Sequence, residues 1–220
     1  MGWNPYNCLS SRNASDLKGC WPANEAVVKA TAVALQKSGL QALGYEYVNL
    51  DAGWALKDRD NYTGRVQWNP TMFPSGLPAL SAWLQERGFK FGIYSDSGTL
   101  HCGGGAPGSI DHEIMDAQTF ADWGVQYLKY DNCFAEDCTL PMCGSNPVAR
   151  YTAMSEALNR TGKPILFNMC EWGIADPALW GPSISNSWRT TADISDEWVY
   201  MCELADLTAE VRHYALSWLQ

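Results

Sequence analysis

The strongest constraint on the fold is a regular alternation of short apolar segments with longer segments of helical periodicity. Each short segment is rich in β-branched and aromatic residues, which is typical of a buried strand. The predicted strands span residues 44–50, 89–94, 125–130, 165–169 and 185–188, and the chain begins inside a further strand.

The segments between the predicted strands carry helical signals. Residues 24–38 repeat apolar side chains at helical spacing, and Asn24 is suited to cap the first turn. Residues 77–87 and 116–123 show the same periodicity. A strand followed by a helix, repeated along the chain, predicts a parallel sheet.

Polar or ionisable residues lie at the end of each predicted strand. In a (β/α)8 barrel the carboxyl ends of the strands form the active-site face, so we expect these side chains to meet. The pattern favours an α/β fold of the (β/α)8 TIM barrel type over a doubly wound sheet, and no G-x-G-x-x-G fingerprint follows the first strand. The residues are Asn49, Asp51, Tyr94, Asp96, Lys129, Asp131, Cys170, Glu171, Arg189 and Asp193.

The charge balance narrows the possible partners. The chain has a formal net charge of −9, and its 15 Lys and Arg residues are scattered, which argues against nucleic acid. No apolar run approaches the roughly 20 residues that span a bilayer, so we expect no membrane partner. The 11 tryptophans favour carbohydrate binding modestly, and we assign most of them to the core.

The eight cysteines indicate disulfides rather than a metal centre. Cys133, Cys138 and Cys143 lack the paired spacing and the histidine of a zinc site, and we expect neither a metal nor a cofactor. Disulfides together with three N-glycosylation sequons predict a secreted, extracellular glycoprotein. No signal peptide is present, so we expect the start of the precursor to be missing. The sequons begin at Asn13, Asn61 and Asn159.

Asp131 is the first candidate catalytic residue. It follows a predicted strand and lies two positions after Lys129. A neighbouring ammonium favours the ionised carboxylate that a nucleophile needs. The alternative is a structural ion pair or a turn-forming aspartate, and this segment alone does not decide between the two interpretations.

Asp193 supplies a second carboxylate at the end of a later strand. Glycoside hydrolysis needs two carboxyl groups, one ionised and one able to hold a proton, and two strand ends of a barrel can place them across one sugar. The pair is therefore more informative than either aspartate alone. The alternative for Asp193 is a helix N-cap, because it precedes a helical stretch from Glu197.

Seven segments, taken in this order, resemble glycoside hydrolase family 27, the α-galactosidases or melibiases. The resemblance runs over nearly the whole chain, and the combination of motifs is highly specific. The segments are MGWN at 1–4, NLDAGW at 49–54, GIYSD at 92–96, DWGV at 122–125, LKYDNC at 128–133, CEWG at 170–173 and WRTTAD at 188–193.

The resemblance implies a retaining α-galactosidase that removes terminal α-D-galactose from oligosaccharides or galactomannan. Asp131 matches the family's nucleophile and Asp193 its acid/base. A disulfide between Cys102 and Cys133 is implied at the edge of the site. We also predict the disulfides Cys8–Cys20 and Cys138–Cys143. The positions matching substrate-binding residues are Asp51, Tyr94, Cys102, Lys129, Glu171, Trp172 and Arg189.

Two positions bear on the choice of sugar. The resemblance places at Trp172 the choice between galactose and N-acetylgalactosamine, and a large ring there leaves little room for an acetamide. Many family members have two adjacent carboxylates where this chain has Asp51 and Ala52. Loss of an acceptor can weaken binding or favour L-arabinopyranose, which leaves a β-L-arabinopyranosidase as an alternative.

The family's chain continues beyond the last matched motif, with two more strands of the barrel and a C-terminal β-sandwich. We therefore expect residues 1–220 to be an incomplete catalytic barrel domain of about six βα units, without the sandwich. Unpaired edge strands promote aggregation, so an inactive, truncated remnant of the enzyme is the other alternative. The sequence does not predict an oligomeric state.

Overall fold

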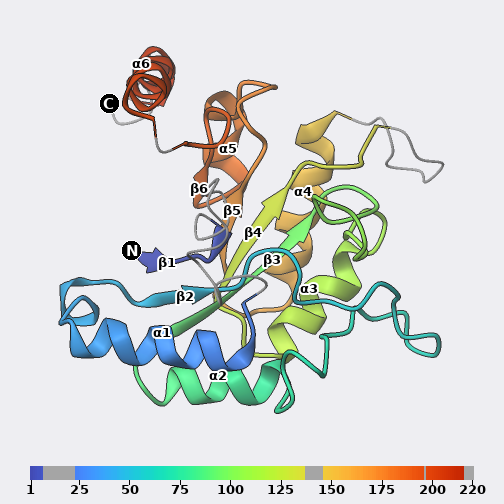
Figure 1. The fold of residues 1–220 in the computed structure, drawn as a ribbon. Coiled ribbons are helices and arrows are strands. Elements are labelled where there is room, and N and C mark those ends of the chain that lie inside the picture. The colour runs from blue at the N-terminus through green and yellow to red at the C-terminus, as the bar shows by residue number, and fades with distance from the viewer. Residues whose placement is uncertain (7–22, 137–145, 196, 216–220) are drawn as a thin grey trace.

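Six parallel strands form one sheet that curls into a half-barrel (Figure 1). The computed structural model describes residues 1–6, 23–136, 146–195 and 197–215, with only the backbone described for 210–215. Each strand pairs in parallel with the next strand of the chain. The strands are β1 (Gly2–Trp3), β2 (Tyr47–Asn49), β3 (Lys90–Asp96), β4 (Tyr127–Asp131), β5 (Leu166–Met169) and β6 (Ser187–Trp188).

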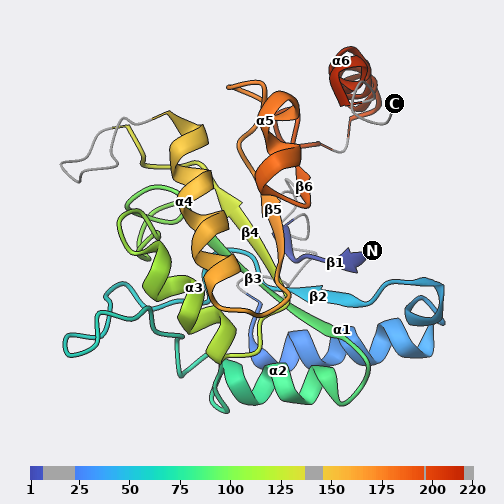
Figure 2. The ribbon, with the colours of Figure 1, turned by 180° about the vertical axis from the view of Figure 1, so that it is seen from behind.

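The helices pack around the sheet, as Figures 1 and 2 show from opposite sides. The first begins where the sequence predicts, because the side chain of Asn24 accepts a hydrogen bond from the N–H of Val27 at 3.0 Å. The pattern missed two helices that start with Pro147 and Pro177. The helices are α1 (Glu25–Lys37), α2 (Leu77–Gln85), α3 (Glu113–Asp122), α4 (Pro147–Arg160), α5 (Pro177–Ile184) and α6 (Trp198–Ala215), with a 3-10 helix η2 (Gln41–Leu43).

The core lies between the sheet and its helices. On β4, Leu128 and Tyr130 are fully buried, and the Tyr130 ring meets the Tyr151 ring of α4 edge-on, with 5.5 Å between centroids. Burial of one such side chain contributes roughly 1.5–3 kcal/mol. This packing orients β4, because successive side chains of a strand point to opposite faces.

The opposite face of β3 and β4 carries the polar residues. Lys129 and Asp131 alternate with the core residues of β4, and the register pairs them with Tyr94 and Asp96 of β3. All four side chains therefore lie on one face of the sheet near the carboxyl ends of the strands. This is the edge at which the sequence predicts the active site.

α6 packs against α5 at the margin of the molecule (Figure 1). Trp198 and Val199 of its first turn are 77 % and 70 % exposed. Among the residues described here, no helix combines the length and the apolar character needed to span a membrane. Asn61 and Asn159 are exposed, as glycosylation acceptors must be, while Asn13 lies outside the described residues.

Candidate active site

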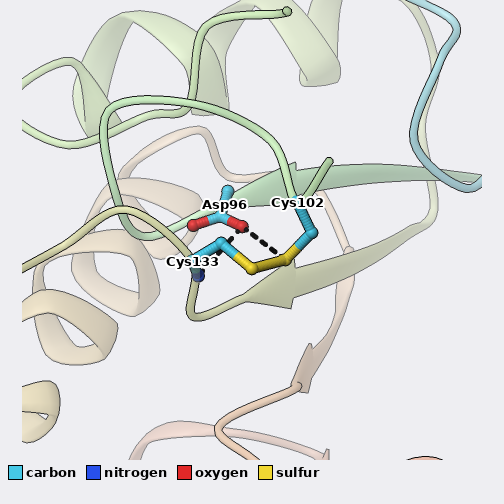
Figure 3. Close-up of side chains that lie close together, drawn as sticks. All are labelled: Asp96, Cys102 and Cys133. Carbon is cyan, nitrogen blue, oxygen red and sulfur yellow. Dashed lines mark hydrogen bonds between the residues drawn. A yellow bond between two sulfur atoms is a disulfide. The ribbon is translucent and has the colours of Figure 1, made fainter. Parts of the chain in front are cut away.

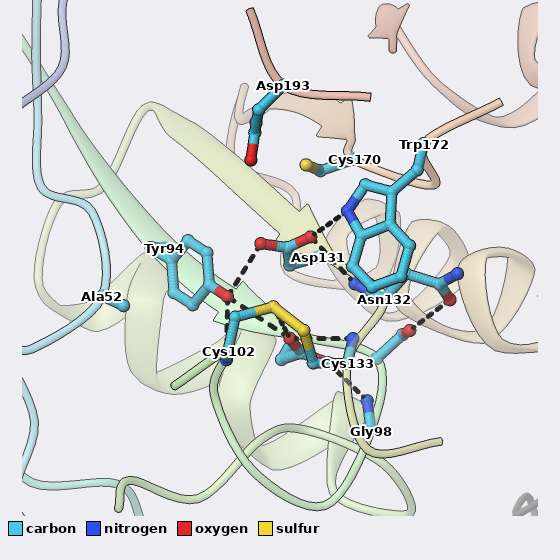
Figure 4. Close-up of a disulfide and its surroundings, with 12 residues drawn as sticks. Ala52, Tyr94, Gly98, Cys102, Asp131, Asn132, Cys133, Cys170, Trp172 and Asp193 are labelled. Carbon is cyan, nitrogen blue, oxygen red and sulfur yellow. Dashed lines mark hydrogen bonds between the residues drawn. A yellow bond between two sulfur atoms is a disulfide. The ribbon is translucent and has the colours of Figure 1, made fainter. Parts of the chain in front are cut away.

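The carboxylate of Asp131 is held by three hydrogen-bond donors (Figure 4). The hydroxyl of Tyr94 on β3 donates to its Oδ2 at 2.9 Å. The indole N–H of Trp172 and the backbone N–H of Asn132 donate to its Oδ1 at 2.9 Å and 3.1 Å. Donors from three parts of the chain thus fix both oxygens of the carboxylate.

Lys129 forms an ion pair with Asp51. Its ammonium donates to Oδ2 of Asp51 at 2.7 Å, and among the described residues Lys129 has no ion pair with Asp131. Burial opposes the charge of Lys129, but Asp51, Cys170 and Asp131 together outweigh burial and raise the pKa of the lysine. The side-chain amide of Asn4 also donates to Oδ2 of Asp51, at 2.9 Å. Lys129 therefore pairs across the sheet rather than along its own strand.

The backbone of the loop after β5 orients the Trp172 indole toward Asp131. Trp172 has a φ of 68°, in the left-handed region that a bulky residue rarely adopts. A Cβ on the next residue, Gly173, would lie 2.1 Å from the carbonyl oxygen of Thr190, so only glycine permits this close approach. The strained tryptophan is thus clamped between the β5 and β6 segments.

Glu171 supports the same loop. Oε1 of its carboxylate accepts a hydrogen bond from the backbone N–H of Ala175 at 3.0 Å, while Oε2 is buried without a hydrogen-bond partner among the described residues. The residue has 0 % of its surface exposed. Its described contacts therefore hold the loop that carries Trp172, and its predicted contact with a sugar stays a prediction.

The structure contains the disulfide between Cys102 and Cys133 that the sequence predicts. It joins the loop after β3 to the end of β4, and the two loops touch so closely that a Cβ on Gly98 would lie 1.8 Å from the carbonyl oxygen of Cys133. The backbone N–H of Cys102 donates to the hydroxyl of Tyr94 at 3.2 Å. The predicted bonds among the other cysteines, Cys8–Cys20 and Cys138–Cys143, lie outside the described residues.

Asp193 follows β6 and faces Asp131 in Figure 4. The guanidinium of Arg189 donates to its Oδ1 at 2.7 Å, and the hydroxyl of Tyr6 donates to its Oδ2 at 3.1 Å. α6 begins only at Trp198, so the described contacts of Asp193 are those of an ion pair rather than of an N-cap. A cavity of about 620 Å³ adjoins this group and is lined by Tyr6, Lys129, Arg189, Asp193 and residues of α6.

Cys170 lies between the two carboxylates (Figure 4). Its thiol is free and buried, and its sulfur accepts a hydrogen bond from Arg189 at 3.2 Å. Burial, followed by the charge of Asp131, raises the pKa of Cys170 to about 12. The thiol is therefore a neutral neighbour of both carboxylates at ordinary pH.

One group of potential metal ligands occurs among the described residues, formed by Asp96, Cys102 and Cys133. The two sulfurs are joined in the disulfide, so they offer no thiolate to a metal ion. Sequence reasoning did not single out Asn4 or Tyr6 as site residues; both follow β1, and only their position after a strand could have indicated them.

Comparisons with known proteins identify the family of this chain. The family model described as alpha galactosidase A, Melibiase_2, matches residues 1–217. Alpha-galactosidase 2 of Arabidopsis thaliana is 45 % identical over 215 residues, which cover 98 % of this chain and 50 % of the relative. The crystal structure of α-galactosidase I from Mortierella vinacea matches with a TM-score of 0.77 and 38 % identity, over 90 % of this chain and 46 % of that chain.

A structure of the α-galactosidase from Saccharomyces cerevisiae with raffinose matches with a TM-score of 0.78 and 35 % identity, over 90 % of this chain and 40 % of that chain. The chain spans about half the length of the curated relatives it matches. Its six-stranded half-barrel accordingly corresponds to part of their TIM barrel. Because the family model covers nearly all 220 residues, the chain belongs to the alpha galactosidase A family, glycoside hydrolase family 27.

Proposed function

We propose that this chain supplies the catalytic carboxylates of a retaining α-galactosidase that removes terminal, non-reducing α-D-galactose from oligosaccharides or galactomannan. The observation that carries the proposal is the environment of Asp131, whose two oxygens are fixed by Tyr94, Trp172 and Asn132 on the face opposite Asp193. A fixed, ionised carboxylate facing a second, more exposed one is the arrangement that double displacement needs.

The reaction then proceeds in two steps. An oxygen of Asp131 attacks C1 of the galactose while the bond from C1 to the leaving oxygen breaks, and Asp193 gives its proton to that oxygen. In the second step Asp193 takes a proton from water, the water oxygen bonds to C1, and Asp131 is released. Two inversions at C1 retain its configuration. Arg189 stabilises the carboxylate that Asp193 becomes after the first step.

The remaining polar groups suit sugar hydroxyls. Asp51 and Lys129 form a buried donor and acceptor pair beside Asp131, and Arg189 reaches the same cavity. A carboxylate can accept from two adjacent hydroxyls, while an ammonium donates to others. Trp172 fills the space beside Asp131 and leaves little room for an acetamide, which supports galactose over N-acetylgalactosamine. The structural match to the yeast enzyme determined with raffinose supports an α-galactoside as the substrate class.

The second candidate activity is that of a β-L-arabinopyranosidase, and it follows from Ala52. A methyl group replaces a carboxylate beside Asp51, so one acceptor for a sugar hydroxyl is missing. Hydrolysis of nitrophenyl α-D-galactopyranoside and of nitrophenyl β-L-arabinopyranoside separates the two activities. We expect the galactoside to be preferred, and Ala52→Asp to raise that preference.

The proposed place of action is outside the cell. The disulfide Cys102–Cys133 beside the site supports an oxidising compartment, where such bonds persist. Exposed sequons at Asn61 and Asn159 support passage through a secretory route. Expression with a secretion signal in yeast, followed by treatment with an endoglycosidase, is expected to show a mass loss that Asn61→Gln and Asn159→Gln reduce.

The test of catalysis uses an extended chain, in which residues 1–220 are followed by the C-terminal half of alpha-galactosidase 2 from Arabidopsis thaliana. Residues 1–220 alone are assayed beside it on melibiose, and we expect the short form to be poorly soluble or inactive. In the extended chain Asp131→Ala and Asp193→Ala should each abolish hydrolysis. Azide should restore turnover only to Asp131→Ala, with release of the inverted glycosyl azide. Wild-type activity in either variant would overturn the assignment, and a soluble extended chain without activity would favour the remnant.

A further inference from the structure

A second carboxyl group is buried beside Asp131. Asp96 is its cross-strand partner on β3 and has 0 % of its surface exposed. In the described part of the chain, Asp96 forms no ion pair. Backbone N–H groups of Gly98 and Cys133 donate to its Oδ1 and Oδ2 at 2.9 Å and 3.2 Å. The group is therefore solvated by neutral dipoles alone, which is costly for a buried charge.

The contact with the disulfide indicates where one proton lies (Figure 3). Oδ2 of Asp96 is 3.3 Å from Sγ of Cys102, and that sulfur is bonded to Cys133. A disulfide sulfur carries no hydrogen, so only Asp96 can donate in this contact. An ionised oxygen there would face the sulfur lone pairs with no proton between them.

The contacts of the Tyr94 hydroxyl also indicate that Asp96 carries a proton. It has one hydrogen and three polar neighbours: Asp131 Oδ2 at 2.9 Å, the N–H of Cys102 at 3.2 Å and Asp96 Oδ2 at 3.3 Å. The single proton belongs to the shortest contact, with Asp131. The tyrosine oxygen is then an acceptor toward Cys102 and Asp96, and the Asp96 contact is satisfied when Asp96 carries a proton.

We propose that Asp96 is a protonated, neutral positioning residue, whose O–H is shared between the Tyr94 oxygen and the disulfide sulfur and directs the Tyr94 proton to Asp131. The proposal rests on the proposed function only in giving Asp131 the catalytic role. A neutral Asp96 also removes the repulsion that two adjacent carboxylates would suffer.

The electrostatic surroundings of Asp96 also favour its protonated form. Burial, followed by the charge of Asp131, raises the pKa of Asp96 well above its ordinary range, while its backbone hydrogen bonds act against this. The neighbouring tyrosines have raised pKa values too, so they are neutral and leave Asp131 as the nearby charge. The titratable groups that interact with Asp96 are Tyr94 on its own strand and Asp131 on β4, with weaker electrostatic contributions between Asp96 and the core residues Tyr130 and Tyr151.

Infrared spectroscopy of the extended chain tests the protonation state, whether or not the protein hydrolyses galactosides. A protonated carboxyl has a C=O stretch well separated from the bands of a carboxylate. At neutral pH we expect the difference spectrum between wild type and Asp96→Asn to contain this C=O band, shifted in D₂O. Asp122→Asn is the matched control, because Asp122 forms an exposed ion pair with Arg65 and its pKa is lowered. A difference spectrum that contains only carboxylate bands for Asp96 would overturn the proposal.

Tyr94→Phe provides a second spectroscopic variant if Asp96→Asn does not fold. Removal of the tyrosine oxygen takes away one acceptor of the Asp96 proton, so the C=O band of the acid should shift to higher frequency. A band that does not respond contradicts the shared proton. This readout is independent of turnover, so it stays informative even if the proposed galactosidase activity fails.

Kinetics of an active extended chain separate a neutral Asp96 from a charged one. Asparagine carries no charge and can still donate to Tyr94, so Asp96→Asn should lower kcat by less than about tenfold and leave the pH profile of kcat/KM in place. Asp96→Ala removes the donor and should lower kcat further, with KM nearly unchanged. A profile displaced toward lower pH in Asp96→Asn would mean that a negative charge had been removed, and would contradict the proposal.

Discussion

Asp131 keeps 6 % of its surface exposed, whereas 53 % of the Asp193 side chain is exposed. The donors of Asp131 stand on inner strands of the sheet or on a loop clamped between β5 and β6. The donors of Asp193 are Arg189 and Tyr6, which follow β6 and β1. These are the two edge strands of the described sheet. We call the two regions the Asp131 side and the Asp193 side.

The difference matches the role that we propose for each carboxylate. A nucleophile must be held at one position and must stay ionised, which a buried set of fixed donors provides. An acid/base must exchange a proton with the leaving group and with water, which requires access. The Asp131 side is complete within the six-stranded sheet, while the Asp193 side rests on strands that have a single neighbour each among the described residues. Substitutions on the Asp131 side should therefore lower stability or kcat/KM more than substitutions on the Asp193 side.

The largest expected effect concerns His101, which lies behind the Asp131 side. The ring is buried, meets the Tyr94 ring edge-on with 5.0 Å between centroids, and has no hydrogen-bond partner among the described residues. Burial, partly offset by the charge of Asp51, lowers the pKa of His101 from 6.5 to about 3. A lowered folded-state pKa stabilises the protein above the unfolded-state value, and this contribution is lost as the pH falls from 6.5 toward 3.

We expect acid to reduce the free energy of unfolding through His101 by on the order of a few kcal/mol. His101→Phe keeps an aromatic ring and cannot titrate, so its urea midpoint should fall less between neutral and acid pH. The measurement is urea unfolding of the extended chain at several pH values. His112→Gln, at a partly exposed histidine, is the matched control. Equal acid sensitivity of wild type and His101→Phe would show that burial of this ring does not govern the response.

The second prediction removes a donor on the Asp131 side. Trp172→Phe keeps most of the ring but deletes the N–H that donates to Asp131 at 2.9 Å. A hydrogen bond to a charged group contributes about 1.5–3 kcal/mol, so kcat/KM on nitrophenyl α-D-galactopyranoside should fall roughly 10- to 100-fold. Trp83→Phe, which alters a ring stacked on Arg87 away from the site, should leave kcat/KM within about twofold. An unchanged kcat/KM in Trp172→Phe would refute the positioning of Asp131 by this indole.

The third prediction concerns the link between the two sides. Nη1 of Arg189 donates both to the Cys170 sulfur at 3.2 Å and to Asp193 Oδ1 at 2.7 Å. Arg189→Lys keeps the charge but cannot reach both acceptors with the same planar geometry, and we expect a loss in kcat of about tenfold. Cys170→Ser retains an acceptor and should lose less than Cys170→Ala. Steady-state kinetics of the three variants would contradict the link if Cys170→Ala matched the wild type.

The sequence predicted the Asp131 side better than the Asp193 side, for a physical reason. Motif residues at the ends of β3 and β4 are placed by strand register, so a pattern of strands is enough to bring Tyr94 and Asp131 together. The ion pair of Lys129 with Asp51 could not be predicted from the segment around Asp131, because Asp51 lies next to Lys129 only through the folding of the sheet.

Other features of the site have no local signal at all. The left-handed backbone of Trp172 depends on its clamp against Thr190, and the proton count at Asp96 depends on a disulfide contact from a separate loop. The apolar periodicity of the sequence also did not predict the helices α4 and α5. The fold class could be predicted because strand periodicity is a local property, whereas these contacts form only when distant segments pack.

The smallest expected effect is that of Tyr6, on the exposed Asp193 side. Its hydroxyl donates to Asp193 Oδ2 at 3.1 Å, and its ring lies 5.0 Å from the Lys129 ammonium. Tyr6→Phe removes the hydroxyl and retains the ring, so the cation–π contact survives while Asp193 keeps Arg189 as its partner. Because exposed hydrogen bonds compete with water and contribute only about 0.5–1.5 kcal/mol, kcat/KM should fall by no more than roughly tenfold. Steady-state kinetics of Tyr6→Phe, measured beside those of Tyr94→Phe, test the comparison of the two sides. A loss for Tyr6→Phe as large as that for Tyr94→Phe would mean that the Asp193 side is held as firmly as the Asp131 side, and that exposure does not distinguish the two carboxylates.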